Sequence, residues 1–184
     1  MNSISKYSSL DRENSIYRQD KGCDCQHPIG KKVIFESNYS NFGPLDVTFE
    51  QGTLNQTFNQ PIASVTIDST CLECKNILID FTGILNVTTT TAFATSTLSF
   101  TLFKICDGMR ARQPVTTFNF FVADLAGGLT ASHTLVFKFP CENNECNDCC
   151  TYILELGSVS NLDFGTVSYS INGTFSALAI GSAC

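Results

Sequence analysis

The feature that most constrains this chain is a two-residue alternation of apolar and polar side chains that recurs along most of its length. Apolar residues stand at positions 45, 47 and 49, at 63, 65 and 67, and at 98, 100 and 102, with Asp, Ser or Thr between them. A strand directs successive side chains to opposite faces of its sheet, so this period indicates half-buried strands. No segment shows the period of an amphipathic helix, and we therefore predict an all-β fold.

Further runs extend the pattern to the end of the chain. Apolar segments at 76–87, 115–125, 135–139 and 152–156 predict more strands. Two alternating runs flank Asn172-Gly173, a pair that favours a tight hairpin turn, and we predict a hairpin there. Eight to ten short strands at this spacing predict an antiparallel β-sandwich, with a jelly roll as the preferred topology.

The chain divides into two parts. Residues 1–30 are polar and mixed in charge and follow neither apolar period, so we predict an extended N-terminal connector arm. Residues 31–184 are predicted to form the β-sandwich domain. The net charge of −6 and the scattered Lys and Arg residues argue against a nucleic-acid partner. No apolar run approaches the length of a membrane-spanning helix, so membrane insertion is not expected.

Ten cysteines are more than a reduced cytosolic protein usually carries, and more than a domain of this size needs for folding. We interpret the extra cysteines as a source of covalent crosslinks, which make a structural material durable. The first ten residues contain no apolar signal-peptide core. We therefore expect a protein made in a bacterial mother cell without a signal peptide and placed on the surface of the developing spore.

The cysteines separate into two groups. Three residues outside the strands and one at a strand end are candidates for disulfides between chains: Cys23, Cys25, Cys106 and Cys184. The rest are candidates for disulfides within one chain, within the 141–150 loop or between neighbouring strand ends: Cys71, Cys74, Cys141, Cys146, Cys149 and Cys150. A zinc or iron–sulfur site remains an alternative, because residues 71–74 and 146–149 each have the Cys-x-x-Cys spacing of half a thiolate site. The favoured interpretation has no metal and no cofactor.

The residue types of common catalytic sites are scarce. His27 and His133 are the two histidines, and no nucleophile elbow, phosphate-binding loop or zinc-protease motif occurs. The acidic residues mostly stand at alternate strand positions, where a solvated face explains them: Asp46, Glu50, Asp68, Asp80 and Glu155. We predict that the protein is not an enzyme.

The strand-rich region is low in Lys and rich in Thr, for instance Thr88-Thr89-Thr90-Thr91. An unblocked edge strand is a template for pairing with another chain. A head-to-tail contact of this kind need not close, so it predicts an open helical homopolymer in which the arm crosses each joint.

The segment CENNECNDCCTY at 141–152, together with VTIDSTC at 65–71 and LIDFTG at 78–83, resembles an uncharacterised cysteine-rich domain family of clostridia. In its overall organisation, with an N-terminal arm that carries two cysteines ahead of a Thr-rich sandwich, the chain is similar to the endospore appendage subunits of spore-forming Firmicutes. This second resemblance implies jelly-roll subunits in pilus-like fibres, with Cys23 and Cys25 as arm thiols bonded to earlier subunits. Cys106 and Cys184 are the expected receivers.

The leading hypothesis is therefore a self-assembling subunit of a disulfide-crosslinked fibre on bacterial endospores. A two-dimensional coat or exosporium lattice is a related alternative. A jelly-roll module that binds a ligand as a soluble monomer is an alternative from another functional class.

Overall fold

The computed structural model describes residues 31–50, 55–90, 93–125, 127–141, 149–161 and 165–183. This part of the chain forms eight β-strands: β1 (Lys31–Phe49), β2 (Asn55–Asp68), β3 (Leu72–Thr89), β4 (Phe93–Cys106), β5 (Gln113–Leu125), β6 (Thr130–Cys141), β7 (Cys149–Asn161) and β8 (Gly165–Ala183). The predicted arm, residues 1–30, lies outside the described residues.

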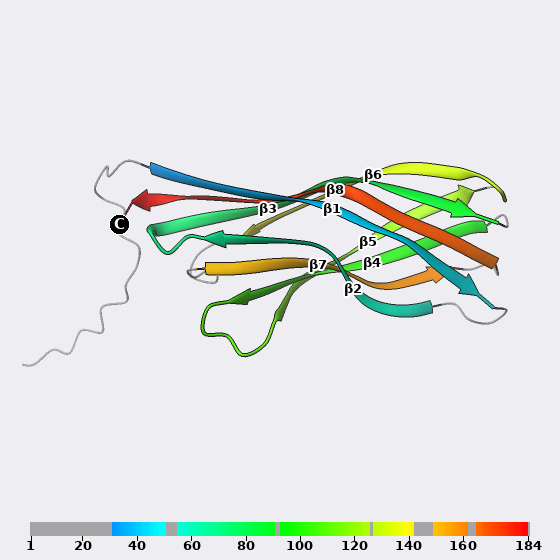
Figure 1. Cartoon of the computed structure of the whole chain (residues 1–184), viewed down its shortest axis with the longest axis horizontal. Coiled ribbons are helices and arrows are strands. Elements are labelled where there is room, and N and C mark those ends of the chain that lie inside the picture. Colours follow the sequence, from blue (N-terminus) through cyan, green and yellow to red (C-terminus); the bar gives the residue numbers. More distant parts are fainter. Residues whose placement is uncertain are drawn as a thin grey trace, which may run out of the picture.

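The strands form two four-stranded sheets that pack face to face (Figure 1). One sheet has the order β1-β8-β3-β6 and the other β2-β7-β4-β5, and all neighbouring strands are antiparallel. Consecutive strands alternate between the two sheets except β4 and β5, which pair within one sheet, and this order is that of an eight-stranded jelly roll. The predicted all-β, jelly-roll-like sandwich is confirmed.

The core follows from the alternation. Side chains predicted to share a face on β1, β2, β4 and β7 all point inward, including Val47, Val65, Phe100 and Leu154. Across the two sheets, Phe118 of β5 stacks on Phe137 of β6 with 4.4 Å between ring centroids. Burial of such apolar surface is the main force that holds two sheets together.

The hairpin predicted at Asn172-Gly173 is wrong. Both residues lie inside the continuous strand β8, where Gly173 pairs with Gly83 of β3. A Cβ at Gly173 would come within 2.6 Å of the Thr82 carbonyl oxygen and 3.0 Å of the Phe81 ring. Glycine is required there because two backbones approach closely beneath an aromatic ring, and not because the chain turns.

An irregularity in β1 determines which side chains face solvent. The register with β8 shifts by one residue between Phe42 and Leu45, around Gly43, whose φ is +99°. Such a bulge reverses the faces of the strand. Beyond it Val47 points into the core, whereas before it Phe35 points outward and is 60% exposed.

Candidate assembly site at the cysteine end of the sandwich

The topology brings both ends of the described chain to one end of the sandwich. The first residue of β1, Lys31, pairs with Ser182 near the end of β8, and Ser182 also pairs with Glu73 at the start of β3. The other odd-numbered strands begin at this end, and the even-numbered strands finish there (Figure 1, left). We call it the cysteine end.

The name follows from where the cysteines stand in the chain. Cys71 and Cys74 flank the start of β3, Cys106 ends β4, Cys141 ends β6, and Cys149 and Cys150 begin β7. Cys184 follows Ala183 directly in the sequence, and Cys23 and Cys25 precede Lys31 by a few residues. The positions of Cys23, Cys25, Cys146 and Cys184 lie outside the described residues, so the pairing predicted for them stays a prediction.

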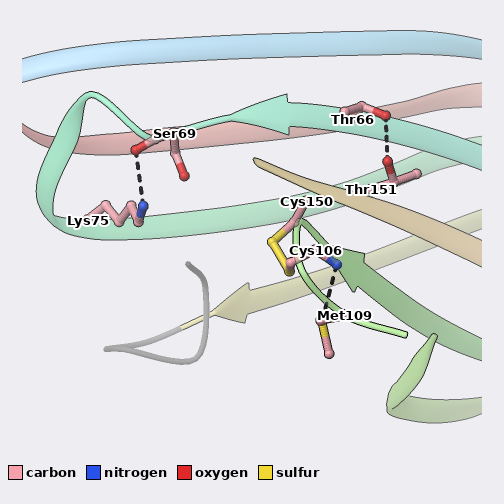
Figure 2. The surroundings of a disulfide bond; sticks show 7 residues. All are labelled: Thr66, Ser69, Lys75, Cys106, Met109, Cys150 and Thr151. Atoms are coloured by element: carbon pink, nitrogen blue, oxygen red, sulfur yellow. Dashed lines mark hydrogen bonds between the residues drawn. A yellow bond between two sulfur atoms is a disulfide. The ribbon is translucent and has the colours of Figure 1, made fainter. Parts of the chain in front are cut away.

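A disulfide joins Cys106 to Cys150, across the neighbouring ends of β4 and β7 (Figure 2). The two residues face each other directly, with 4.0 Å between Cα atoms and 44 residues between them in sequence. In the chain-entropy model, closing a loop of this length stabilises the fold by about 4 kcal/mol. The prediction that Cys106 bonds another chain is therefore corrected, because its sulfur is bonded to its cross-strand neighbour.

The loops around this disulfide are held by local hydrogen bonds (Figure 2). The Cys106 N–H donates to Met109 Sδ at 3.2 Å, in the turn that follows β4. Lys75 Nζ of β3 donates to the carbonyl oxygen of Ser69, which lies in the turn between β2 and β3, at 3.0 Å. The cysteine end therefore has an ordered framework on which further thiols are displayed.

Two of those thiols are free. Cys71 is exposed and Cys149 is half-buried, and neither forms a disulfide. Both had been predicted to bond within the chain, so this assignment is corrected for the described structure. Cys149 is adjacent in sequence to a bonded cysteine, but successive strand residues point to opposite faces, which separates its sulfur from that of Cys150.

The surroundings of the two free thiols differ. Lys32 Nζ donates a hydrogen bond to Cys71 Sγ at 3.0 Å. Exposed cysteines beside a cationic side chain are the type that enters disulfide exchange. By contrast, burial raises the pKa of Cys149, and the nearby carboxylates Asp107 and Asp68 raise it further. Cys149 therefore holds its proton more firmly than an ordinary thiol.

The remaining cysteines are accounted for in part. Cys141 is disulfide-bonded and buried, as expected for a member of the intrachain group. The side chain of Cys74 lies outside the part of the chain that the structure describes.

Among the residues that the structure describes, no three His, Cys, Asp or Glu side chains gather as a metal site would require. The same residues include no helix of the length and hydropathy that crossing a membrane requires.

The contact between Lys32 and Cys71 is the feature that the sequence did not reveal. The two residues are 39 positions apart, and they meet only because β1 and the β2–β3 turn share one end of the fold. The Cys-x-x-Cys spacing indicates only that Cys71 and Cys74 could form half of a metal site. Nothing in the sequence around Lys32 indicates that its side chain contacts a cysteine.

Comparison with known proteins gives one family match. The model of a domain of unknown function, DUF4489, matches residues 43–180. No curated protein matches the chain.

Several solved structures of infectious bursal disease virus are similar at low identity. The Gt strain structure is 13% identical with a TM-score of 0.44, covering 97% of this chain and 43% of that one. The VP2 subviral particle is 16% identical with a TM-score of 0.42, covering 84% of this chain and 38% of that one. This chain thus spans less than half the length of those solved chains, and the jelly-roll assignment rests on the strand order alone.

Proposed function

The chain belongs to the DUF4489 family, a domain of unknown function, and from this premise we propose that it is a self-assembling structural subunit of an extracellular, disulfide-crosslinked fibre. The observation that carries the proposal is the exposed free thiol of Cys71 at the end of the sandwich where β1 begins. A subunit that displays a thiol there offers a point of attachment to the cysteines of another copy.

The proposed bond joins Cys23 or Cys25 of one copy to Cys71 of the next. Two thiols become one disulfide by giving up two protons and two electrons, and molecular oxygen in an oxidising environment accepts them. Cys71 is favoured over Cys149 because it is exposed and hydrogen-bonded to the Lys32 ammonium, whereas Cys149 is half-buried and its pKa is raised by burial and by nearby carboxylates. Each bond turns a reversible contact into a covalent one.

The non-covalent contact is assigned to the sheet edges. β1 and β2 are edge strands that lie beside each other, since Asn38 Nδ2 donates to the Ser64 carbonyl oxygen at 2.9 Å and Ser40 Oγ donates to that of Ile62. β5 and β6 are the other two edges. Pairing of an edge on the β5–β6 side of one copy with an edge on the β1–β2 side of the next is a head-to-tail contact that leads to an open helical polymer.

The proposed location is the surface of bacterial endospores, a proposal supported by the similarity in overall organisation to endospore appendage subunits. The number of cysteines supports an oxidising location of this kind. Gold-labelled antibodies against the protein should decorate fibres on intact spores. Label confined to a continuous layer would favour a two-dimensional coat lattice instead.

Gel electrophoresis in detergent, with and without reductant, tests the crosslinking. The purified chain should give a ladder that collapses to a monomer band on reduction. Replacing both arm cysteines, Cys23→Ser with Cys25→Ser, should abolish the ladder, and Cys71→Ser should do the same because it removes the receiver. Cys149→Ser is the matched control, since it removes the other free thiol among the described residues and should leave the ladder intact.

Two results would reject the proposal. One is a wild-type chain that runs as a monomer without reductant, which is the behaviour of a soluble binding module. The other is a ladder that survives the double arm variant, which would place the crosslinks elsewhere.

A further inference from the structure

We propose that an apolar patch on the outer face of the β1-β8-β3-β6 sheet binds residues 1–22 of a second copy of this chain. The inference rests on the proposed function, because the disulfide at Cys71 is what brings that segment to the patch. The patch consists of two adjacent cross-strand rows at the cysteine end. Its members are Val33, Phe35, Leu78, Pro140, Leu178 and Ile180.

The register explains why these side chains meet. Val33 pairs with Ile180, and two residues further along β1, Phe35 pairs with Leu178. Leu178 pairs in turn with Leu78, and Leu78 with Pro140. Residues two apart on a strand share a face, so both rows point away from the core.

The patch is exposed and sharply bounded. Val33 is 57% exposed, Phe35 60% and Ile180 39%. The next row along the sheet is polar and includes an ion pair between Lys138 and Asp80, with 3.5 Å between Nζ and Oδ2. An exposed apolar patch that is bordered by polar residues is typical of an interaction surface.

The patch also has depth. A pocket of about 290 Å³ opens on this face between β3, β6 and β8, and its lining includes Leu78, Pro140, Leu178 and Ile180. A hollow of this size accepts a large apolar side chain. It therefore suits a segment that carries isolated apolar residues better than a flat second sheet.

The outer face of the other sheet has a different character. Pairs of hydroxyl groups bond across its strands, as between Thr66 and Thr151 at 2.8 Å and between Thr101 and Thr117 at 3.2 Å. Ladders of this kind are satisfied by their own neighbours and by water. The apolar patch is thus a local feature of one sheet at one end.

The segment 1–22 is the occupant that the chain itself supplies. It contains isolated apolar residues among polar ones, including Ile4, Tyr7 and Leu10. Twenty-two extended residues span up to about 70 Å, which is more than the patch requires. Four basic and three acidic side chains leave the segment nearly neutral, so a body of negative net charge does not repel it.

The tether places this segment next to the patch. Lys32, whose ammonium contacts Cys71 Sγ at 3.0 Å, is the residue immediately before Val33. A neighbouring copy bonded to Cys71 through Cys23 therefore presents its residues 1–22 at the edge of the patch. Tethering of this kind raises the effective concentration to the millimolar range, so a weak apolar contact becomes occupied.

The test uses a synthetic peptide of residues 1–22 and the full chain carrying Cys23→Ser and Cys25→Ser, which keeps it from crosslinking. Methyl NMR signals of Val33, Leu178 and Ile180 should shift on titration, while those of Ile84 and Val136, exposed on the same face beyond the polar row, should not. Phe35→Ser should weaken peptide binding at least tenfold. Tyr39→Ser is the matched control, because Tyr39 is 73% exposed on the same face of β1 and outside the patch.

Each other outcome overturns the proposal. Patch signals that ignore the peptide but change when Tyr7 and Leu10 of the same chain are replaced by Ser assign the patch to the chain's own arm. Signals that change with protein concentration alone assign it to a second body, and no response of any kind leaves the patch without this ligand. The peptide has no cysteine, so failed binding beside an intact gel ladder rejects the docking alone, and binding without a ladder rejects the crosslinking alone.

Discussion

Glu155 shows how far a single residue can depart from its sequence pattern. Its position on β7, on the face opposite Leu154 and Leu156, had indicated a solvated carboxylate. That prediction is wrong, because Glu155 is only 1% exposed and forms an ion pair with Arg112. Arg112 reaches it from the segment before β5 and also lies over the Phe103 ring, with 4.4 Å between guanidinium carbon and centroid. A partner 43 residues away leaves no trace in the local alternation.

Removing this guanidinium should destabilise the fold. Arg112→Met leaves Glu155 buried without its counter-charge, and we expect the free energy of unfolding to fall by about 2–3 kcal/mol. The loss is below that of a fully buried pair, since the Arg112 side chain is 45% exposed. Urea unfolding measures it, with Arg110→Met at an exposed neighbouring position as the control. Equal stability of the two variants would contradict a structural role for the pair.

Two buried tyrosines should make the protein sensitive to alkaline pH. Burial raises the pKa of Tyr152 and of Tyr169 to about 12, from the ordinary tyrosine value of 10.0. Because the folded pKa is above the unfolded one, the stability that each contributes is complete below pH 10 and is lost as the pH rises to 12. At full effect the loss is about 3 kcal/mol for each residue.

Unfolding by urea at a series of pH values from 9 to 12 measures this loss. A variant with Tyr152→Phe and Tyr169→Phe should lose less stability across this range than the wild type. Tyr39→Phe, at an exposed position, should keep the wild-type pH profile. Identical profiles for the double variant and the wild type would show that these phenols do not set the alkaline limit.

At the scale of strands, the sequence predicts periods well and connections less well. The alternation on β2, β4 and β7 was sufficient to assign inward and outward faces, because a strand has one period and one buried side. Asn172-Gly173 misled, since the same dipeptide that suits a tight turn also suits a close approach of β8 to β3. Only the pairing partner distinguishes the two, and a partner strand some 90 residues away is not visible locally.

Gly173→Ala tests this reinterpretation. If β8 is continuous, the new Cβ meets backbone at 2.6 and 2.7 Å and the Phe81 ring at 3.0 Å, so the strands must separate. We expect a loss of about 1–3 kcal/mol in the free energy of unfolding. Gly128→Ala is a useful comparison, because nothing lies within 4 Å of a Cβ there and its cost would come from a φ of +77° alone. A neutral Gly173→Ala variant would contradict the close approach.

On the scale of the whole molecule, the jelly roll gathers at one end the cysteines that the structure describes. The cysteine count predicted covalent crosslinking, but the partner of Cys106 and the free state of Cys71 required the fold. Spacing along the chain does not show which strand ends are neighbours. The same topology brings the start of β1 to the free thiol, and this juxtaposition underlies the proposed assembly.

Disulfide mapping of mixed-isotope polymer tests that assembly most directly. Fibres formed from equal amounts of ¹⁴N- and ¹⁵N-labelled chains are digested without reduction, and crosslinked peptides are identified by mass spectrometry. We predict peptides in which a segment with Cys23 or Cys25 is bonded to the segment with Cys71, half of them carrying one light and one heavy partner. Peptides that are always entirely light or entirely heavy would show that the arm bonds its own body, and would contradict the account.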